Sequence, residues 1–78
     1  MDNHEFTFGS FNDGEIAFAK TTVNGITVEF QGWNTFPSVH YDKVLVIKDG
    51  KTIFVDNSIS LDSVAHADVQ HYIEKALK

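Results

Sequence analysis

Hydrophobic and polar residues alternate along most of the chain, and short turn sequences interrupt the alternation. The clearest case is the run KVLVIKDGKTIFVD at 43–56, where two β-type segments flank Asp49-Gly50. An Asp-Gly pair suits a two-residue type I′ turn, because both central residues need a positive φ. Folding the run there predicts four cross-strand pairs: Lys43 with Asp56, Val44 with Val55, Leu45 with Phe54, and Val46 with Ile53.

Two further turn pairs, Asp13-Gly14 and Asn24-Gly25, also lie between alternating segments. This arrangement is typical of successive β-hairpins. We therefore expect strands at about 5–11, 15–23, 26–32, 43–48 and 51–56.

After the last strand the hydrophobic period changes to that of a helix, which we expect from about 61 to 77. Ser60 would cap its N-terminus, and Asp62 would lie in its first turn. The helix would gather these apolar residues on one side: Leu61, Ala65, Val69, Tyr72, Ile73 and Ala76.

The predicted fold is an α+β domain of residues 1–78, in which one C-terminal helix packs on one face of an antiparallel, meander-like sheet of about five strands. We call the side of the sheet toward the helix the inner face and the other side the outer face. Small alanines would lie opposite large phenylalanines on the inner face, as close packing requires. Its predicted members are Phe6, Phe8, Ala17, Ala19, Val23, Ile26, Val28 and Phe30.

The outer face also carries apolar residues, which a single helix on the opposite side leaves uncovered. By the pairing above they are Phe11, Ile16, Phe18, Leu45, Ile47 and Phe54. Monomeric proteins rarely expose a large contiguous apolar patch, so this pattern indicates a surface for self-association or for another protein. Two alternatives remain: the stretch 31–42 folds over these residues, or a one-residue slip in register exchanges the faces.

The stretch QGWNTFPSVHYD at 31–42 is the longest predicted connection and is rich in aromatic residues. Pro37 argues against a regular central strand, although an edge strand stays possible. Trp33, Phe36 and Tyr41 there either anchor the loop to the core or form part of a partner-binding site, because tryptophan and tyrosine are enriched where proteins dock.

Composition narrows the classes of partner. The chain has 78 residues and a formal charge of −5, with six positive side chains, all lysine. Arginine makes the bidentate contacts to phosphate and guanine, and an acidic chain repels a polyanion, so we expect no nucleic-acid partner. No apolar run approaches a membrane span, so we expect no membrane partner. A small secreted domain usually needs disulfides, and this chain has no cysteine, so a cytoplasmic location is favoured.

Candidate chemistry is sparse. His66 and His71, five residues apart on a helix, point about 140° apart and cannot share a metal ion unaided. His40 and Asp42 would share a face of an extended segment, but such a pair is a weak metal pattern. There is no cysteine nucleophile and no glycine-rich phosphate loop, so we expect no metal, no cofactor and no catalytic activity. Asp68, at the edge of the helical apolar stripe, would contact Tyr72 or make a polar contact between helix and sheet.

The sequence thus favours a non-enzymatic protein-binding module, such as an accessory or inhibitor protein, that forms a homodimer through its outer face. One alternative is an acidic mimic of nucleic acid that inhibits a basic protein. The acids before residue 16 support it, whereas Asp62, Asp68 and Glu74 point in different directions on the helix. The other alternative is a small enzyme that uses His40 and Asp42.

Overall fold

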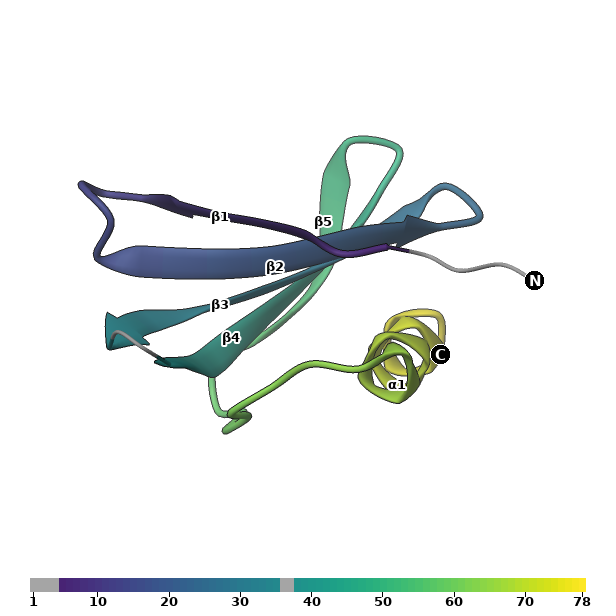
Figure 1. The fold of residues 1–78 in the computed structure, drawn as a ribbon. Coiled ribbons are helices and arrows are strands. Elements are labelled where there is room, and N and C mark those ends of the chain that lie inside the picture. Colours follow the sequence, from purple (N-terminus) through teal and green to yellow (C-terminus); the bar gives the residue numbers. More distant parts are fainter. Residues whose placement is uncertain (1–4, 36–37) are drawn as a thin grey trace.

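The computed structural model describes residues 5–35 and 38–78, drawn as a ribbon in Figure 1. Five strands precede one helix: β1 (Thr7–Phe11), β2 (Ile16–Val23), β3 (Ile26–Thr35), β4 (Ser38–Lys48), β5 (Lys51–Asp56) and α1 (His66–Ala76). The strands form one antiparallel sheet in the order β1-β2-β3-β4-β5, and α1 lies against one face of it. The predicted α+β meander with a C-terminal helix is confirmed.

The turns between strands follow the predicted chemistry. Asn24 and Asp49 have φ angles of 52° and 54°, and Gly25 and Gly50 follow with 82° and 77°. Two successive positive φ angles are what a type I′ turn requires, and Asn-Gly and Asp-Gly supply them at low cost. The register around the first two turns is also as expected, with Phe8 opposite Ala19, Lys20 opposite Glu29, and Val23 opposite Ile26.

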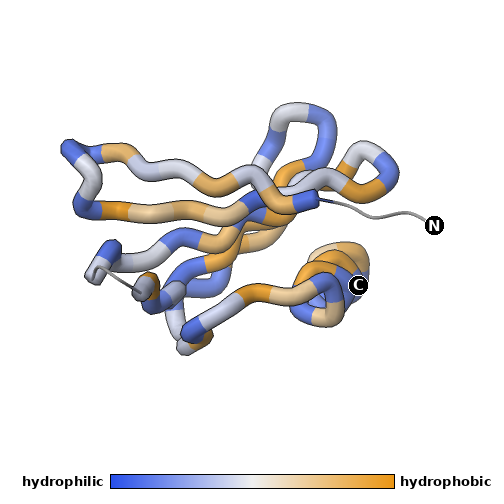
Figure 2. Tube along the Cα trace, viewed as in Figure 1, coloured by the Kyte–Doolittle hydropathy of each residue, from blue (hydrophilic) through white to orange (hydrophobic). Residues whose placement is uncertain are grey.

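The core lies between the inner face and α1. Figure 2 shows hydrophobic segments in the central strands and along α1. Phe30 is completely buried, and its ring meets those of Tyr41 and Tyr72 edge to face. Val69 and Ile73 are the buried residues of α1. The other buried apolar residues are Ala17, Ala19, Ile26, Val28, Val44 and Val46.

The predicted inner face is largely confirmed, because five of its eight members are buried. Phe6 and Val23 are half-buried and pack against the core. Phe8 is on this face but remains 66% exposed. It borders a hollow of about 390 Å³ with Val39, Val64 and four further residues.

The pairing predicted between the last two strands is wrong. The structure pairs Val46 with Phe54 and Leu45 with Val55, and Ile53 is an extra residue in a β-bulge. A bulge shifts the register by one residue, so side chains beyond it change faces. Phe54 therefore belongs to the inner face, where its ring lies 6.3 Å from that of Tyr72.

The predicted helix start is also wrong. The helix begins at His66, and the segment before it is not helical. Leu61 forms a bridge with Tyr41, in which Tyr41 N–H donates to Leu61 O at 2.8 Å and Leu61 N–H donates to Tyr41 O at 3.0 Å. These bonds compete with an earlier helical turn. Ala65 is the N-cap residue, and its N–H donates to Asp68 Oδ2 at 2.9 Å.

The stretch 31–42 is not a loop over the outer face. Most of it extends β3 and β4, while Phe36 and Pro37 lie outside the described residues. Gly32 permits this extension, because a Cβ atom there would lie 1.9 Å from the carbonyl oxygen of His40. Asp42 is the extra residue in a bulge between the pairs Gln31–Lys43 and Gly32–Tyr41.

Candidate functional site

The outer face has no described helix packed against it, because α1 lies on the other side of the sheet (Figure 1). One row of side chains crosses four strands through directly paired positions: Phe11 opposite Ile16, Ile16 opposite Trp33, and Trp33 opposite His40. Phe11 is 44% exposed and Trp33 54% exposed. The strand order thus assembles aromatic residues from separate hairpins into one surface.

Phe18 adds to this surface from the adjacent row. Its ring lies 6.3 Å from that of Phe11, and it covers Gly9, where a Cβ atom would meet the ring at 2.6 Å. We call the group Phe11, Ile16, Phe18 and Trp33 the aromatic end of the outer face. Beside it is a shallow hollow of about 260 Å³ lined by Phe11, Ile16, Gln31, Gly32, Trp33, Asp42 and Lys43.

A second apolar group lies on the same face across β4 and β5. Leu45 and Ile47 are half-buried, and Val55, the partner of Leu45, is 47% exposed. We call Leu45, Ile47 and Val55 the aliphatic end. The β5 bulge moves Val55 onto this face in place of Phe54, so the predicted outer-face residue Phe54 is replaced there by Val55.

Eight of the nine predicted binding residues are in the described part of the chain, and they divide into three groups. Phe11, Ile16, Phe18 and Trp33 come together at the aromatic end, and Leu45 and Ile47 lie at the aliphatic end. Tyr41 is buried in the core at 6% exposure, and burial raises its pKa above the usual 10.0. Tyr41 and Phe54 are therefore structural residues, and Phe36 lies outside the described residues.

A polar band separates the two apolar ends. Lys20 pairs with Glu29, and Gln31 pairs with Lys43, on adjacent rows of the outer face. Gln31 Nε2 donates to Glu29 Oε2 at 2.7 Å, and Lys20 Nζ lies 5.4 Å from the centroid of the Phe18 ring. The outer face therefore carries both signs of charge, although the chain as a whole is acidic.

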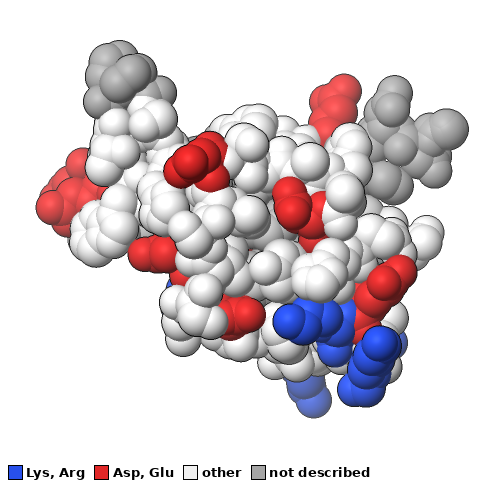
Figure 3. Space-filling view, turned by 90° about the horizontal axis from the view of Figure 1, so that it is seen from below, with Lys and Arg blue, Asp and Glu red and all other residues white. Residues whose placement is uncertain are grey.

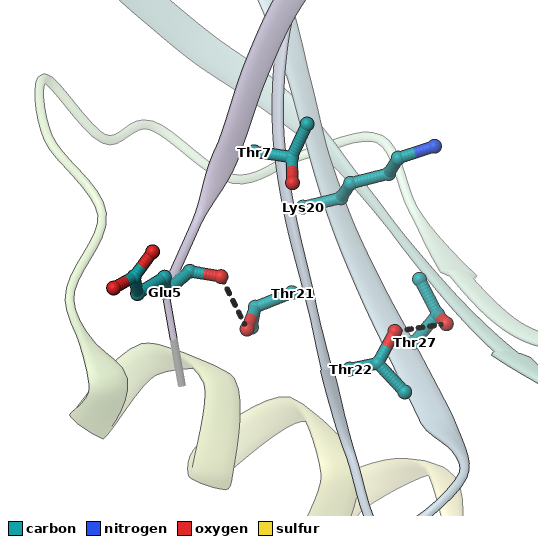
Figure 4. Close-up of a pocket in the computed structure, with 6 residues that line it drawn as sticks. All are labelled: Glu5, Thr7, Lys20, Thr21, Thr22 and Thr27. Atoms are coloured by element: carbon teal, nitrogen blue, oxygen red, sulfur yellow. Dashed lines mark hydrogen bonds between the residues drawn. The ribbon is translucent and has the colours of Figure 1, made fainter. Parts of the chain in front are cut away.

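A hollow of about 390 Å³ lies at another margin of the sheet, lined by Glu5, Thr7, Lys20, Thr21, Thr22 and Thr27 (Figure 4). Its threonines bond mainly within the protein: Thr21 Oγ1 donates to Glu5 O at 3.1 Å, and the hydroxyls of Thr22 and Thr27 are 2.8 Å apart. These hydroxyls hold the strands and the N-terminal segment together.

The helix side of the molecule differs from the outer face in how its charged groups are distributed. Figure 3, viewed from that side, shows acidic groups dispersed over the surface and separated by uncharged areas, with lysines gathered near one margin. An acidic mimic of nucleic acid needs a continuous row of negative charge to occupy a basic groove. The described residues of this face do not present such a row.

His40 has two side-chain partners, and both come from the segment before α1. His40 Nδ1 lies 3.0 Å from Asp62 Oδ1, and His40 Nε2 lies 3.2 Å from Ser60 Oγ. The Leu61–Tyr41 bridge explains this geometry, because residues on either side of Leu61 project toward the same side of the segment. The carboxylate at Nδ1 is thus that of Asp62.

Sequence reasoning missed this cluster because it placed Ser60 and Asp62 at a helix N-terminus. The alternation Ile59-Ser60-Leu61-Asp62 is a signal for an extended segment that could have revealed it. Within the described residues, no group of three or more metal-ligating side chains is assembled.

Comparison with known protein families, with curated proteins and with solved structures finds no match to this chain. Among the described residues, no helix is both long and apolar enough to cross a lipid bilayer.

Proposed function

We propose that the protein is a binding module that associates with a second copy of itself through the outer face of its sheet. The observation that carries the proposal is that both apolar ends of this face are open to solvent. The described residues of the stretch 31–42, which could have covered them, lie within the sheet instead. Burial of exposed apolar groups against another surface removes them from water and lowers the free energy of the pair.

The size of the face fits a second copy. The molecule measures 33 by 27 by 21 Å, so a face bounded by the two longer dimensions is large enough for the roughly 800 Å² per partner that a standard interface buries. Face-to-face packing of two sheets also leaves each core unchanged, because the residues concerned are not the ones that contact α1.

Charge favours the same occupant. Two copies that each carry −5 repel one another, and this repulsion is weakest where the local charge is balanced. The outer face offers Lys20 and Lys43 beside Glu29 and Asp42. An acidic protein therefore meets least resistance to self-association on this face.

The test uses two phenylalanines of one strand. Phe11→Lys places a charge at the exposed aromatic end, where it would have to be desolvated on association. Phe8→Lys is the matched control, because Phe8 lies on the same strand, is more exposed, and belongs to the inner face. Phe54→Lys would not serve as a test, since Phe54 packs against the core.

Sedimentation velocity over a wide range of concentration measures the outcome, and circular dichroism checks that each variant is folded. We expect a dimer for the wild type and Phe8→Lys, and a monomer for Phe11→Lys. A monomeric wild type at all concentrations would overturn self-association and leave a different protein as the partner. A dimer that persists in Phe11→Lys but not in Phe8→Lys would place the interface on the inner face and overturn the proposal.

A further inference from the structure

We propose that Ser60 is a nucleophile that accepts acyl groups from activated esters, with His40 as its general base and Asp62 as the residue that orients His40. The inference goes beyond self-association and does not depend on it. It rests on the order of the three groups: Asp62 lies at Nδ1 of the imidazole and Ser60 at Nε2.

The two distances meet the geometric requirement for this chemistry. A nucleophile and its base must lie within about 2.6–3.2 Å, and a third group must orient the base. Ser60 Oγ is 3.2 Å from His40 Nε2, and Asp62 Oδ1 is 3.0 Å from His40 Nδ1. A proton on Nδ1 directed at the Asp62 carboxylate leaves the lone pair of Nε2 facing the serine hydroxyl.

The backbone fixes this arrangement from two sides. His40 is in β4 between the Gly32 close approach and the Asp42 bulge, while the bridge at Leu61 holds the segment that carries Ser60 and Asp62. Preorganised geometry of this kind lowers the entropic cost of proton transfer. The backbone therefore places the three side chains within reach of one another.

The reaction is a balanced acyl transfer. Ser60 Oγ attacks the carbonyl carbon of the ester, and its proton passes to His40 Nε2. The bond between that carbon and the leaving oxygen then breaks, and the leaving group departs with the proton from His40. Water subsequently attacks the acyl-serine by the same route, which releases the carboxylic acid and restores Ser60.

Exposure limits which substrates can react. The side chains of His40 and Asp62 are 46% and 93% exposed, so water surrounds the cluster and supplies hydrogen bonds to the developing oxyanion. Water stabilises that charge less than a preorganised, enclosed site does. The substrate class is therefore esters with good leaving groups, such as aryl esters.

The neighbouring surface favours the same class. Trp33 is the direct cross-strand partner of His40, and Phe11 and Ile16 continue the row on the outer face. Together they line the hollow of about 260 Å³, which can receive an aromatic leaving group. The hollow adjoins the cluster through Trp33, the cross-strand partner of His40.

The experiment incubates the full chain with p-nitrophenyl acetate, follows release of nitrophenolate, and locates the acetyl group by peptide mass spectrometry. We expect acetylation of Ser60 at least roughly a hundredfold faster than of any other serine, the low end of what a positioned base contributes. Ser60→Ala and His40→Gln should remove this fast phase. Asp62→Asn should slow it while Ser60 remains the acetylated residue.

Ser63→Ala is the matched control, because Ser63 is an exposed serine on the same segment, whereas the serine at His40 Nε2 is Ser60. It should leave acetylation of Ser60 unchanged. Equal rates for the wild type and Ser60→Ala, or an adduct only on lysine or histidine, would overturn the proposal. Circular dichroism should show all variants folded, since these side chains are exposed.

Discussion

Gly32→Ala is the substitution whose effect the structure predicts most sharply. Gly32 lies in the central strand β3, directly opposite Tyr41. A Cβ atom there would lie 1.9 Å from His40 O, 2.6 Å from the His40 carbonyl carbon and 2.6 Å from Tyr41 Cα. All three are backbone atoms of β4, so no side-chain rotation can relieve the clash.

The size of the effect follows from these distances. Ordinary van der Waals contact begins near 3.4 Å, so the two strands would have to separate by the difference, about 1.5 Å, at this point. That displacement breaks the local ladder bonds, each worth about 1 kcal/mol, and disturbs the packing of buried Tyr41. We expect a loss of roughly 3 kcal/mol from a total stability of about 4–12 kcal/mol for a chain of this length.

Urea unfolding monitored by Trp33 fluorescence measures the change in free energy. Gly9→Ala is the matched control, because its new Cβ atom would meet only the far end of the Phe18 ring, on the exposed strand β1. We expect it to cost less than about 1 kcal/mol. If Gly32→Ala costs no more than Gly9→Ala, the close approach of β3 and β4 at Gly32 is refuted.

Two other substitutions test single hydrogen-bonded groups. Asp68→Ala removes the acceptor of the Ala65 N–H and the acidic residue of the first helical turn, so chemical denaturation should show a loss of about 1 kcal/mol, whereas Asp68→Asn should retain part of it. Ser58 donates to Asp56 Oδ1 through its hydroxyl at 2.7 Å and its N–H at 2.9 Å, and these bonds lower the Asp56 pKa below its usual 3.8. Ser58→Ala should therefore raise the Asp56 pKa toward 3.8 in an NMR titration; an unchanged midpoint would show that the hydroxyl is not the main cause. A lowered pKa in the folded state stabilises the protein above pH 3.8, and the contribution disappears as the pH falls through the lowered value.

The sequence predicted the regular parts of the fold well, because local rules determine them. Asn24-Gly25 and Asp49-Gly50 have the conformational freedom that a type I′ turn demands, and alternation then decides which side chains face the core. The aromatic end of the outer face followed directly from the register of the first two hairpins. Phe11, Ile16 and Phe18 were assigned to the outer face correctly for that reason.

The errors share a different cause: each arises where the regular pattern is interrupted. One extra residue at Ile53 exchanged Phe54 and Val55 between faces, and nothing in the local sequence distinguishes a bulge from continuous pairing there. The bridge between Leu61 and Tyr41 joins residues far apart in the sequence, and its two hydrogen bonds outweigh the local helical preference. Long-range contacts of this kind are not encoded in hydrophobic periodicity.

The irregular positions are also the ones that build the candidate chemistry. The bulge at Asp42 allows Tyr41 to enter the core while His40, the preceding residue, faces outward beside Trp33. The backbone of Tyr41 also hydrogen-bonds to that of Leu61. This bridge positions Ser60 and Asp62 beside His40. Both arrangements require Gly32, because only a residue without Cβ lets β3 lie so close to the β4 backbone at His40 and Tyr41. Gly32→Ala should therefore abolish rapid acetylation of Ser60 as well as lower stability. If the variant stays folded and Ser60 is acetylated at the wild-type rate, the close approach of β3 and β4 at Gly32 is not what positions the cluster.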